Sequence, residues 1–369
     1  MSFDPYKALY IHIPFCKSRC AYCDFATDAI KSDSKIVRNY LDKLIYDLRD
    51  ASKKGKLEEI ETIYIGGGTP THLGHDKLVE LIYFLSTTLS MRKITEFTIE
   101  ANPESLTEEM VKDIYSLGVN RISIGVQSFD DGLLKILSRA HTSKEARNAI
   151  SIAKTRFKNV SIDLMCGIPT QSLDMWEKDI SAAIEMGIQH ISVYPLTIEP
   201  KTKFYKLCMR GKMPWPDDDL QADMMQKASE ILTKAKFHRY EVASYALDGF
   251  ESKHNSAYWS GVPYLGIGKS ATTMTQNEDR RMREKDGFIV DDLDKPQMAA
   301  EDIMLGFRMS RGVTDEKIQE STDLLPDLPN KLKELEDKGL IKRDEGAFVP
   351  TQKGWLCGNE LYGEIFDLA

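Results

Sequence analysis

Short apolar runs alternate with longer amphipathic segments over roughly the first 200 residues of the chain. The apolar runs are rich in β-branched residues and have the length of buried strands, whereas the segments between them repeat hydrophobic residues at helical spacing. This alternation predicts parallel strands joined by helical crossovers. Eight such units would close a full barrel, so six units predict an α/β fold with a partial (β/α)6 barrel of the TIM type. The expected strands are 9–15, 61–65, 94–101, 121–126, 160–166 and 190–196.

The pattern changes after residue 200. Residues 252–275 are rich in glycine, serine and aromatic residues and show no clear periodicity. Near residue 297 a helix–hairpin–helix pattern begins, with a turn at Asp344-Glu345-Gly346, and it predicts a winged-helix-like domain. We therefore expect a core barrel over residues 1–240, a connecting segment over 241–296 and a C-terminal domain over 297–369.

The charge of the chain argues against a nucleic-acid partner. The formal net charge is −8, and residues 297–369 hold nine Lys/Arg against fifteen Asp/Glu. Because a surface that binds phosphates needs positive charge, we do not expect the winged-helix-like domain to bind DNA. No apolar run approaches the roughly 20 residues of a membrane span, and the N-terminus lacks the basic and apolar regions of a signal peptide. We expect a cytoplasmic protein that is not itself a membrane protein.

Three cysteines, Cys16, Cys20 and Cys23, stand at the spacing CxxxCxxC directly after the first predicted strand. In a reducing compartment such a group indicates a metal site rather than disulfides. Thiolates suit zinc or iron–sulfur clusters, but a closed zinc site needs four protein ligands. Three cysteines would leave one iron of a [4Fe–4S] cluster, which ordinarily has four cysteine ligands, open for an outside ligand. A partial zinc site or incidental cysteines stay as alternatives at this point.

Polar residues and glycines stand at the ends of the predicted strands, where barrel folds gather their functional groups. Consecutive glycines, as in Gly66-Gly67-Gly68-Thr69-Pro70, let a ligand approach the backbone closely. Carboxylates can pair with an ammonium group or accept hydrogen bonds from ribose hydroxyls, and a guanidinium is the natural bidentate partner of a carboxylate. The carboxylates are Glu100 and Asp163, the guanidinium is Arg139, and Gln127 ends the fourth predicted strand.

The cysteine loop, with an aromatic residue at Tyr22, resembles the cluster loop of the radical S-adenosylmethionine (SAM) superfamily. Five segments, YxHxPFC from Tyr10, GGGTP, EANP, GVQSF and DLMCGIP, together resemble the oxygen-independent coproporphyrinogen III oxidase branch of that superfamily. The resemblance implies a [4Fe–4S] cluster on the three cysteines, with SAM on its open iron and cleavage of SAM to methionine and a 5′-deoxyadenosyl radical. It implies that Tyr10 packs beside the cluster and that SAM is bound by Gly67, Gly68, Thr69, Glu100, Gln127, Arg139 and Asp163.

Within this branch the chain resembles the HemW type, which comprises haem chaperones. Phe25 stands where the oxidase type has a further cysteine, and Cys16 comes almost at once, without the longer N-terminal extension of the oxidase. The segment from His254 to Trp259 matches the motif HNxxYW of the HemW type. An imidazole is a good iron ligand and the aromatic rings offer a flat wall, so the resemblance implies haem as cargo with His254 as candidate axial ligand. Residues 266–271 depart from the usual GxGAHS pattern because a lysine, Lys269, replaces the small residue and the histidine is missing.

Three functions follow from the resemblance. The first is a haem chaperone that delivers haem to an acceptor, such as a membrane haemoprotein. The second is oxidative decarboxylation of coproporphyrinogen III, which Phe25 disfavours. The third is a radical-SAM enzyme that acts on haem itself. Whether SAM is cleaved productively, and whether the chain forms a homodimer, are left open.

Overall fold

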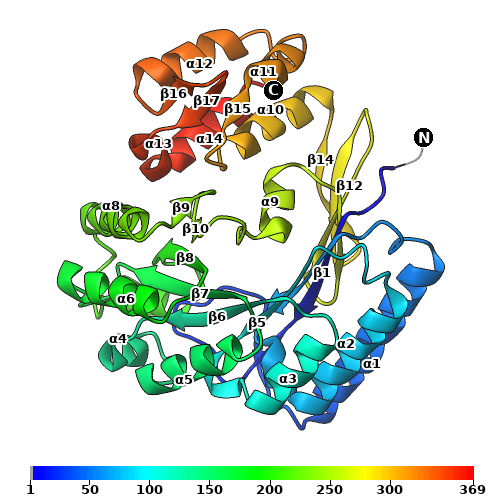
Figure 1. The fold of residues 1–369 in the computed structure, drawn as a ribbon. Coiled ribbons are helices and arrows are strands. Elements are labelled where there is room, and N and C mark those ends of the chain that lie inside the picture. Colours follow the sequence, from blue (N-terminus) through cyan, green and yellow to red (C-terminus); the bar gives the residue numbers. More distant parts are fainter. Residues whose placement is uncertain (1–2) are drawn as a thin grey trace.

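The computed structural model describes residues 3–369 and contains one large curved sheet (Figure 1). Six parallel strands lie side by side in chain order, as the sequence predicts, and a twelve-stranded sheet contains them all. This order confirms the partial (β/α)6 barrel. The six strands are β1 (Ala8–Ile13), β4 (Thr62–Gly67), β5 (Glu96–Ala101), β6 (Arg121–Gln127), β7 (Asn159–Cys166) and β8 (His190–Pro195).

Helices cover the outer face of these strands. Several begin at side-chain caps, among them a capping box in which Thr142 and Glu145 bond reciprocally. The apolar residues of the strands, such as Ile63 and Phe97, pack under the helices in one large core. The helices are α1 (Lys35–Lys53), α2 (His75–Thr88), α3 (Glu108–Ser116), α4 (Asp131–Ile136), α5 (Ser143–Lys154) and α6 (Leu173–Glu185), with short 3-10 turns at η1 (Pro70–Leu73) and η2 (Pro103–Ser105).

The inner face of the barrel is polar. Side chains alternate across a strand, so the neighbours of the core residues point to the concave side. On β5 the core residues are Phe97 and Ile99, and the inward residues are Glu96, Thr98 and Glu100. The other parallel strands alternate in the same way. Charged and hydroxyl side chains inside a barrel need hydrogen-bond partners, and a bound ligand can provide some of them.

The segment after β8 joins the same sheet. Residues 252–275, which lack a clear periodicity, contain one helix and two strands, and β11 pairs in parallel with β1. A side chain at Gly266 in β11 would lie 2.2 Å from the backbone of Thr272, which explains a glycine in this strand. The elements are α7 (Lys203–Met209), α8 (Asp218–Lys234), β9 (His238–Arg239), β10 (Ser244–Ala246), α9 (Lys253–Trp259), β11 (Tyr264–Ile267), β12 (Thr272–Gln276), β13 (Arg281–Lys285) and β14 (Phe288–Leu293).

The C-terminal part has its own core and adds one strand to the predicted helix–hairpin–helix pattern. The third strand, β15, is only two residues long, too short for a sequence pattern. In Figure 1 this part lies beyond α9 on the concave side of the sheet, and α10 contacts α9 and β14. Its elements are α10 (Lys295–Gly306), β15 (Val313–Thr314), α11 (Asp315–Thr322), α12 (Leu328–Asp337), β16 (Ile341–Asp344), β17 (Ala347–Pro350), α13 (Gln352–Leu356) and α14 (Gly358–Phe366).

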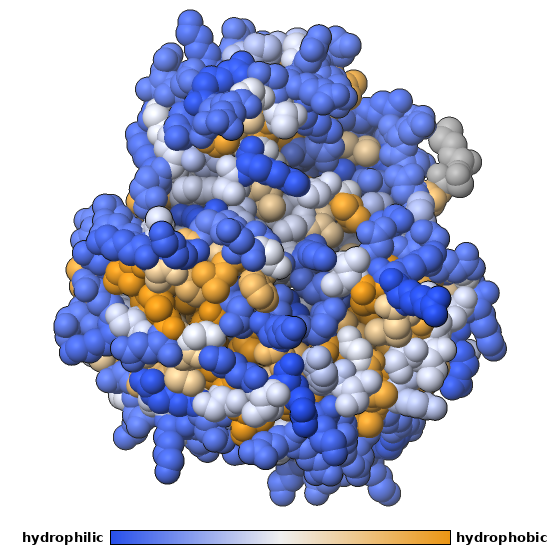
Figure 2. All heavy atoms as spheres, in the orientation of Figure 1, coloured by the Kyte–Doolittle hydropathy of each residue, from blue (hydrophilic) through white to orange (hydrophobic). Residues whose placement is uncertain are grey.

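The visible surface of the C-terminal part is mostly polar (Figure 2). Hydrophilic residues cover most of its visible face, whereas hydrophobic residues gather over the barrel below it (Figure 2). In the part of the chain that the structure describes, no helix combines the length and the apolar character needed to cross a bilayer. The division at residues 240 and 296 stays a prediction, although β10 to β14 make the middle segment part of the main sheet.

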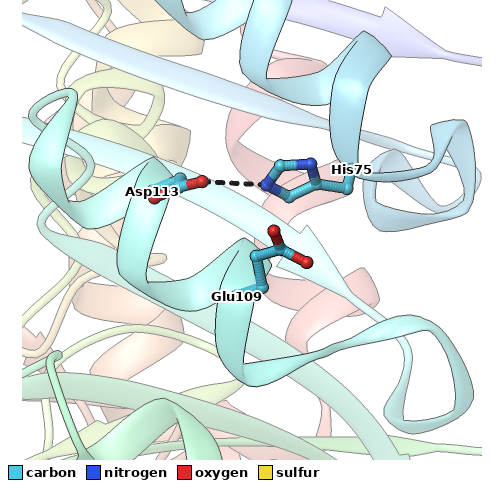
Figure 3. Close-up of side chains that lie close together, drawn as sticks. All are labelled: His75, Glu109 and Asp113. Atoms are coloured by element: carbon cyan, nitrogen blue, oxygen red, sulfur yellow. Dashed lines mark hydrogen bonds and ion pairs between the residues drawn. The ribbon is translucent and has the colours of Figure 1, made fainter.

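A histidine and two acidic residues connect helices α2 and α3 on the outside of the barrel. His75 Nε2 lies 2.9 Å from Asp113 Oδ2, and Glu109 lies beside them (Figure 3). Hydrogen bonds with Asp76 and then Asp113 raise the pKa of His75. These three side chains are partly exposed, and the hydrogen bond between His75 and Asp113 links the two helices.

Candidate cluster and cofactor site

The three cysteines lie on a loop that two small strands close at its base. Strand β2 (Phe15–Cys16) pairs in parallel with β3 (Asp28–Ala29), so residues 17–27 form a closed loop. The N–H of Ala21, within the loop, donates to Leu137 O over 3.0 Å after α4, and its carbonyl accepts from Phe204 N–H of α7 over 2.9 Å. Two helices therefore hold the loop from behind.

All three thiols line one cavity of about 500 Å³ at the carboxyl ends of the barrel strands. None is in a disulfide. The same cavity is lined by all seven residues that the resemblance implies for SAM binding: Gly67, Gly68, Thr69, Glu100, Gln127, Arg139 and Asp163. This volume is within the range of small-ligand sites, about 300–1,000 Å³.

The environment of the thiols fits an iron–sulfur cluster with one open position. Thr69 Oγ1–H donates to Cys16 Sγ over 3.4 Å, and Arg139 Nη1 to Cys20 Sγ over 3.5 Å. Burial raises the pKa of Cys16 to about 11 and also raises the pKa of Cys23, so positive metal charge is needed to keep these groups as thiolates. Among the described residues that line the cavity there is no fourth cysteine and no histidine, so a closed zinc site is not completed here.

The glycine segment after β4 lies directly against the cysteine loop. Gly68 N–H donates to Ile13 O and Thr69 N–H to Phe15 O, both over 2.8 Å. A Cβ atom at Gly68 would lie 2.7 Å from the same Ile13 oxygen. Gly67 has φ +107°, and a Cβ atom there would lie 2.3 Å from the ring of His12. Only glycine allows this approach, and it leaves the backbone exposed to a ligand in the cavity.

Two partly buried carboxyl groups line the cavity from β5 and β7. Glu100 accepts hydrogen bonds from Tyr64 Oη–H over 2.7 Å and from Gly67 N–H over 2.9 Å, yet burial raises its pKa to about 7. Burial likewise raises the pKa of Asp163 to about 6, against the opposing effect of the nearby Arg121 charge. Each would gain from a cationic or hydroxyl-bearing ligand that restores its charge.

Arg139 is the cation of the site. It donates to Asn102 Oδ1 over 2.7 Å and to Gly125 O over 2.6 Å. Burial works against its charge, but Tyr22, Cys20 and Glu104 outweigh this effect and raise the pKa of Arg139. Its buried Nε atom has no hydrogen-bond partner within residues 3–369. A guanidinium in the cavity wall suits an anionic ligand group.

Gln127 is held in a strained backbone conformation. Its φ is +68°, and the register between β6 and β7 shifts between Gly125 and Gln127. Non-glycine residues in this region of φ and ψ cost free energy and collect at binding sites. The bulge ends the strand and sets Gln127 in the cavity wall.

Comparisons with known proteins agree with this geometry. Residues 10–183 match the model of the radical SAM superfamily, and residues 293–357 match the HemN C-terminal domain. The chain is 36% identical to the heme chaperone HemW of Bacillus subtilis (strain 168), over 97% of this chain and 98% of that protein. It is 39% identical to the heme chaperone HemW of Escherichia coli (strain K12), over 72% of this chain and 70% of that protein. The chain belongs to the HemW family of the radical SAM superfamily.

The solved structure of coproporphyrinogen III oxidase (HemN) from Escherichia coli has the same fold. Its TM-score is 0.79 over 99% of this chain and 90% of that chain, at 19% sequence identity. As in the radical SAM superfamily, the cofactors are a [4Fe–4S] cluster and SAM, and the three thiols, the two carboxyl groups and Arg139 fit both. When bound, the cluster supplies the electron for reduction of SAM.

Two residues that the resemblance singles out, Tyr10 and His254, do not line this cavity. Tyr10 lines a second cavity, where its hydroxyl donates to His12 Nδ1 over 3.0 Å. His254 is fully buried, and its two ring nitrogens lie 2.9 Å from Thr62 Oγ1 and 2.9 Å from Tyr258 Oη. In this conformation the imidazole has no free nitrogen for iron. Contact of Tyr10 with the cluster and SAM, and ligation of haem by His254, therefore stay predictions without support from the geometry.

The loop that departs from the HemW-family pattern still packs on the cysteine loop. Lys269 Nζ forms an ion pair with Asp28 of β3 over 3.1 Å, and its backbone N–H donates to Tyr40 Oη. Lys269 therefore supports the base of the cysteine loop from outside.

Several residues that line the cavity were not predicted from the sequence, among them Asn102, Ser123 and Tyr194. Asn102 connects Arg139 with Thr69, since its Nδ2–H donates to Thr69 Oγ1 over 2.9 Å. Ser123 and Tyr194 also line the cavity. The signal for Asn102 and Tyr194 was present, because both stand at strand ends, as the predicted residues do. Ser123 lies deeper in β6, and strand alternation from Gly125 would have found it.

Proposed function

We propose that this protein is a haem chaperone that binds a [4Fe–4S] cluster, SAM and haem, and delivers the haem to an acceptor protein. The proposal rests above all on similarity along almost the whole chain to proteins named heme chaperone HemW. Phe25 supports it. This ring, in the cysteine loop, is 67% exposed and stands at the position where the oxidase type has a further cysteine.

For SAM we propose a role for each polar group of the cavity. The guanidinium of Arg139 would bind the carboxylate of the methionine part, and the Gly67–Gly68 backbone with Glu100 would bind its ammonium group. Asp163 would accept hydrogen bonds from the ribose hydroxyls. Thr69 and Gln127 would complete the contacts. The support is that these residues line one cavity with the three thiols.

The acceptor that we propose is a haemoprotein, which includes membrane-associated ones, and the proposed location is the cytoplasm. Haem is a hydrophobic, reactive cargo, so a carrier has to shield it until an acceptor takes it. We also propose that the chain can form a homodimer, which is to be measured together with haem binding.

Anaerobic reconstitution followed by haem titration, with and without SAM, tests the function. The expected result is a shift of the Soret band without chemical change of the haem, and transfer of the haem to an apo-haemoprotein. Decarboxylation of coproporphyrinogen III in the presence of SAM and a reductant would replace the chaperone by an oxidase. Bleaching of added haem would replace it by an enzyme that acts on haem.

A further inference from the structure

A second cavity, of about 570 Å³, lies next to the cluster cavity. Asp24 and Phe25 of the cysteine loop line both cavities, so the two sites share a wall. The other walls are β1, the helix α9, the helix α10 through Leu305, and the edge strands β11 to β13. A ligand in this cavity would therefore lie beside the cluster site without entering it.

Aromatic rings form a large part of this cavity. Tyr10, Tyr258, Trp259 and Tyr264 line it together with Phe25. The hydroxyls of Tyr10 and Tyr258 are engaged by histidine nitrogens, and Trp259 Nε1 donates to Glu241 over 3.1 Å. The polar ends of these side chains are thus bonded away, and their rings are left to contact a flat apolar ligand.

Strand β13 brings positive charge to the rim. Arg281, Arg283 and Lys285 follow one another on one face of the strand. The acidic residues of α10, chiefly Glu301, pair with both arginines, and Asp291 also pairs with Arg283. Lys285 is exposed, lines the cavity, and forms no ion pair within residues 3–369. Among the described residues that line the cavity, the one acidic residue is Asp24, in the cysteine loop.

Within residues 3–369, no imidazole or thiol in this cavity is free to bind iron. Its only histidine, His12, places Nε2 3.0 Å from the carbonyl oxygen of Ala26 and Nδ1 3.0 Å from the Tyr10 hydroxyl. A carbonyl only accepts, so Nε2 carries the proton and both nitrogens are used. His254 lies behind Tyr258 with both nitrogens bonded. The described lining contains no cysteine and no methionine.

We propose that this second cavity is the haem site, and that it holds haem by the faces of the macrocycle and by its propionate carboxylates rather than by an imidazole or thiol on the iron. The inference rests on the proposed haem-chaperone function and adds the location and the mode of recognition. Tyr258, Trp259 and Tyr264 contact the ring, and Lys285 with Arg283 contacts the propionates. His254 is a positioning residue that fixes Tyr258. The absence of an imidazole or thiol bond to the iron suits a carrier. An acceptor protein that offers such a ligand can then take the haem.

Titrations of the full-length, cluster-loaded protein with three probes test the inference: haem, metal-free protoporphyrin IX, and its dimethyl ester. Because recognition excludes the iron, haem and the metal-free porphyrin should bind with dissociation constants within about threefold of each other. Lys285→Glu should raise the dissociation constants of haem and of the metal-free porphyrin by about tenfold or more. The variant loses a charge-assisted contact with a propionate and adds repulsion between two carboxylates. The same variant should bind the uncharged dimethyl ester with nearly the affinity of the wild type. Lys53→Glu, an exposed lysine on α1 without an ion pair within residues 3–369, is the matched control.

The outcomes separate the site from the function. If haem binds but Lys285→Glu and Lys53→Glu behave alike, the second cavity is not the site, although the chaperone function stands. If haem binds and metal-free porphyrin does not, an iron ligand holds the haem and the proposed mode of recognition is wrong. If the cluster-loaded protein binds no porphyrin at all, the proposed function itself fails.

Discussion

The backbone N–H of Gly67 donates a 2.9 Å hydrogen bond to Glu100 Oε2, which ties the glycine segment to the next strand of the barrel. This bond and that of Tyr64 do not offset burial, so the Glu100 carboxyl has a pKa of about 7 and is half protonated at neutral pH. The backbone that would hold the ammonium group of SAM is therefore coupled to a titrating acid.

We expect SAM affinity to depend on pH through Glu100. Only the ionised carboxylate attracts a cation, and the ammonium group of SAM stays mostly protonated below pH 7. With a pKa of about 7 for Glu100, the dissociation constant should therefore rise about fivefold between pH 7 and pH 6. Glu100→Gln removes the titration and should bind more weakly at pH 7, with a flatter profile. Isothermal titration at three pH values measures this. A mutant profile as steep as that of the wild type would mean that another group titrates.

Two glycine substitutions separate steric clash from backbone strain. Gly68→Ala places a Cβ atom 2.7 Å from Ile13 O, and we expect it to destabilise the protein by about 2–3 kcal/mol and to lower its iron content. Gly74→Ala is the matched control, because its φ is +86° but nothing lies within 4 Å of the added atom. It should cost about 1 kcal/mol and leave the iron content intact. Urea unfolding and iron analysis give both quantities, and equal iron loss in both variants would contradict the close approach.

Replacement of a cluster cysteine should abolish the cluster. Cys16→Ser removes one of three ligands, and we expect loss of the visible iron–sulfur absorption after anaerobic reconstitution. Cys208→Ser is the control, since this thiol lies in α7 and donates to Pro214 O, outside the cluster cavity. A full [4Fe–4S] cluster in Cys16→Ser would show that the ligand assignment is wrong.

The barrel and its strand-end residues could be predicted because their signals are local. Alternating strands and helices occur as neighbours in sequence, and each strand end carries its polar residue within the same segment. Glu100, Gln127 and Asp163 therefore reach one cavity as expected. Parallel strands align their carboxyl ends, so sequence order alone gives this result.

The interior behind the site could not be predicted, because its contacts join distant parts of the chain. Glu96, on β5, accepts from the backbone N–H groups of Lys253 and His254 and so binds the start of α9. The partner of the His254 ring, Thr62, lies 192 residues away in sequence. The HNxxYW motif places a histidine beside aromatic residues. Nothing in this local pattern indicates that the imidazole ring forms hydrogen bonds inside the barrel.

The buried state of His254 should appear in the pH dependence of stability. Burial lowers its pKa from 6.5 to about 3, so below pH 6.5 the unfolded chain binds a proton that the folded chain does not. Stability should therefore fall as the pH decreases, by about 2 kcal/mol between pH 7 and pH 5 from this residue alone. His254→Asn should lose that part of the slope. His75 is the contrasting control: hydrogen bonds with Asp76 and then Asp113 raise its pKa, so its stabilisation is full below pH 6.5 and is lost as the pH rises through its folded pKa. His75→Asn should thus change the slope with the opposite sign. Urea unfolding of apoprotein at several pH values measures both, and a His254→Asn slope equal to that of the wild type would mean that the ring is not held neutral in the barrel.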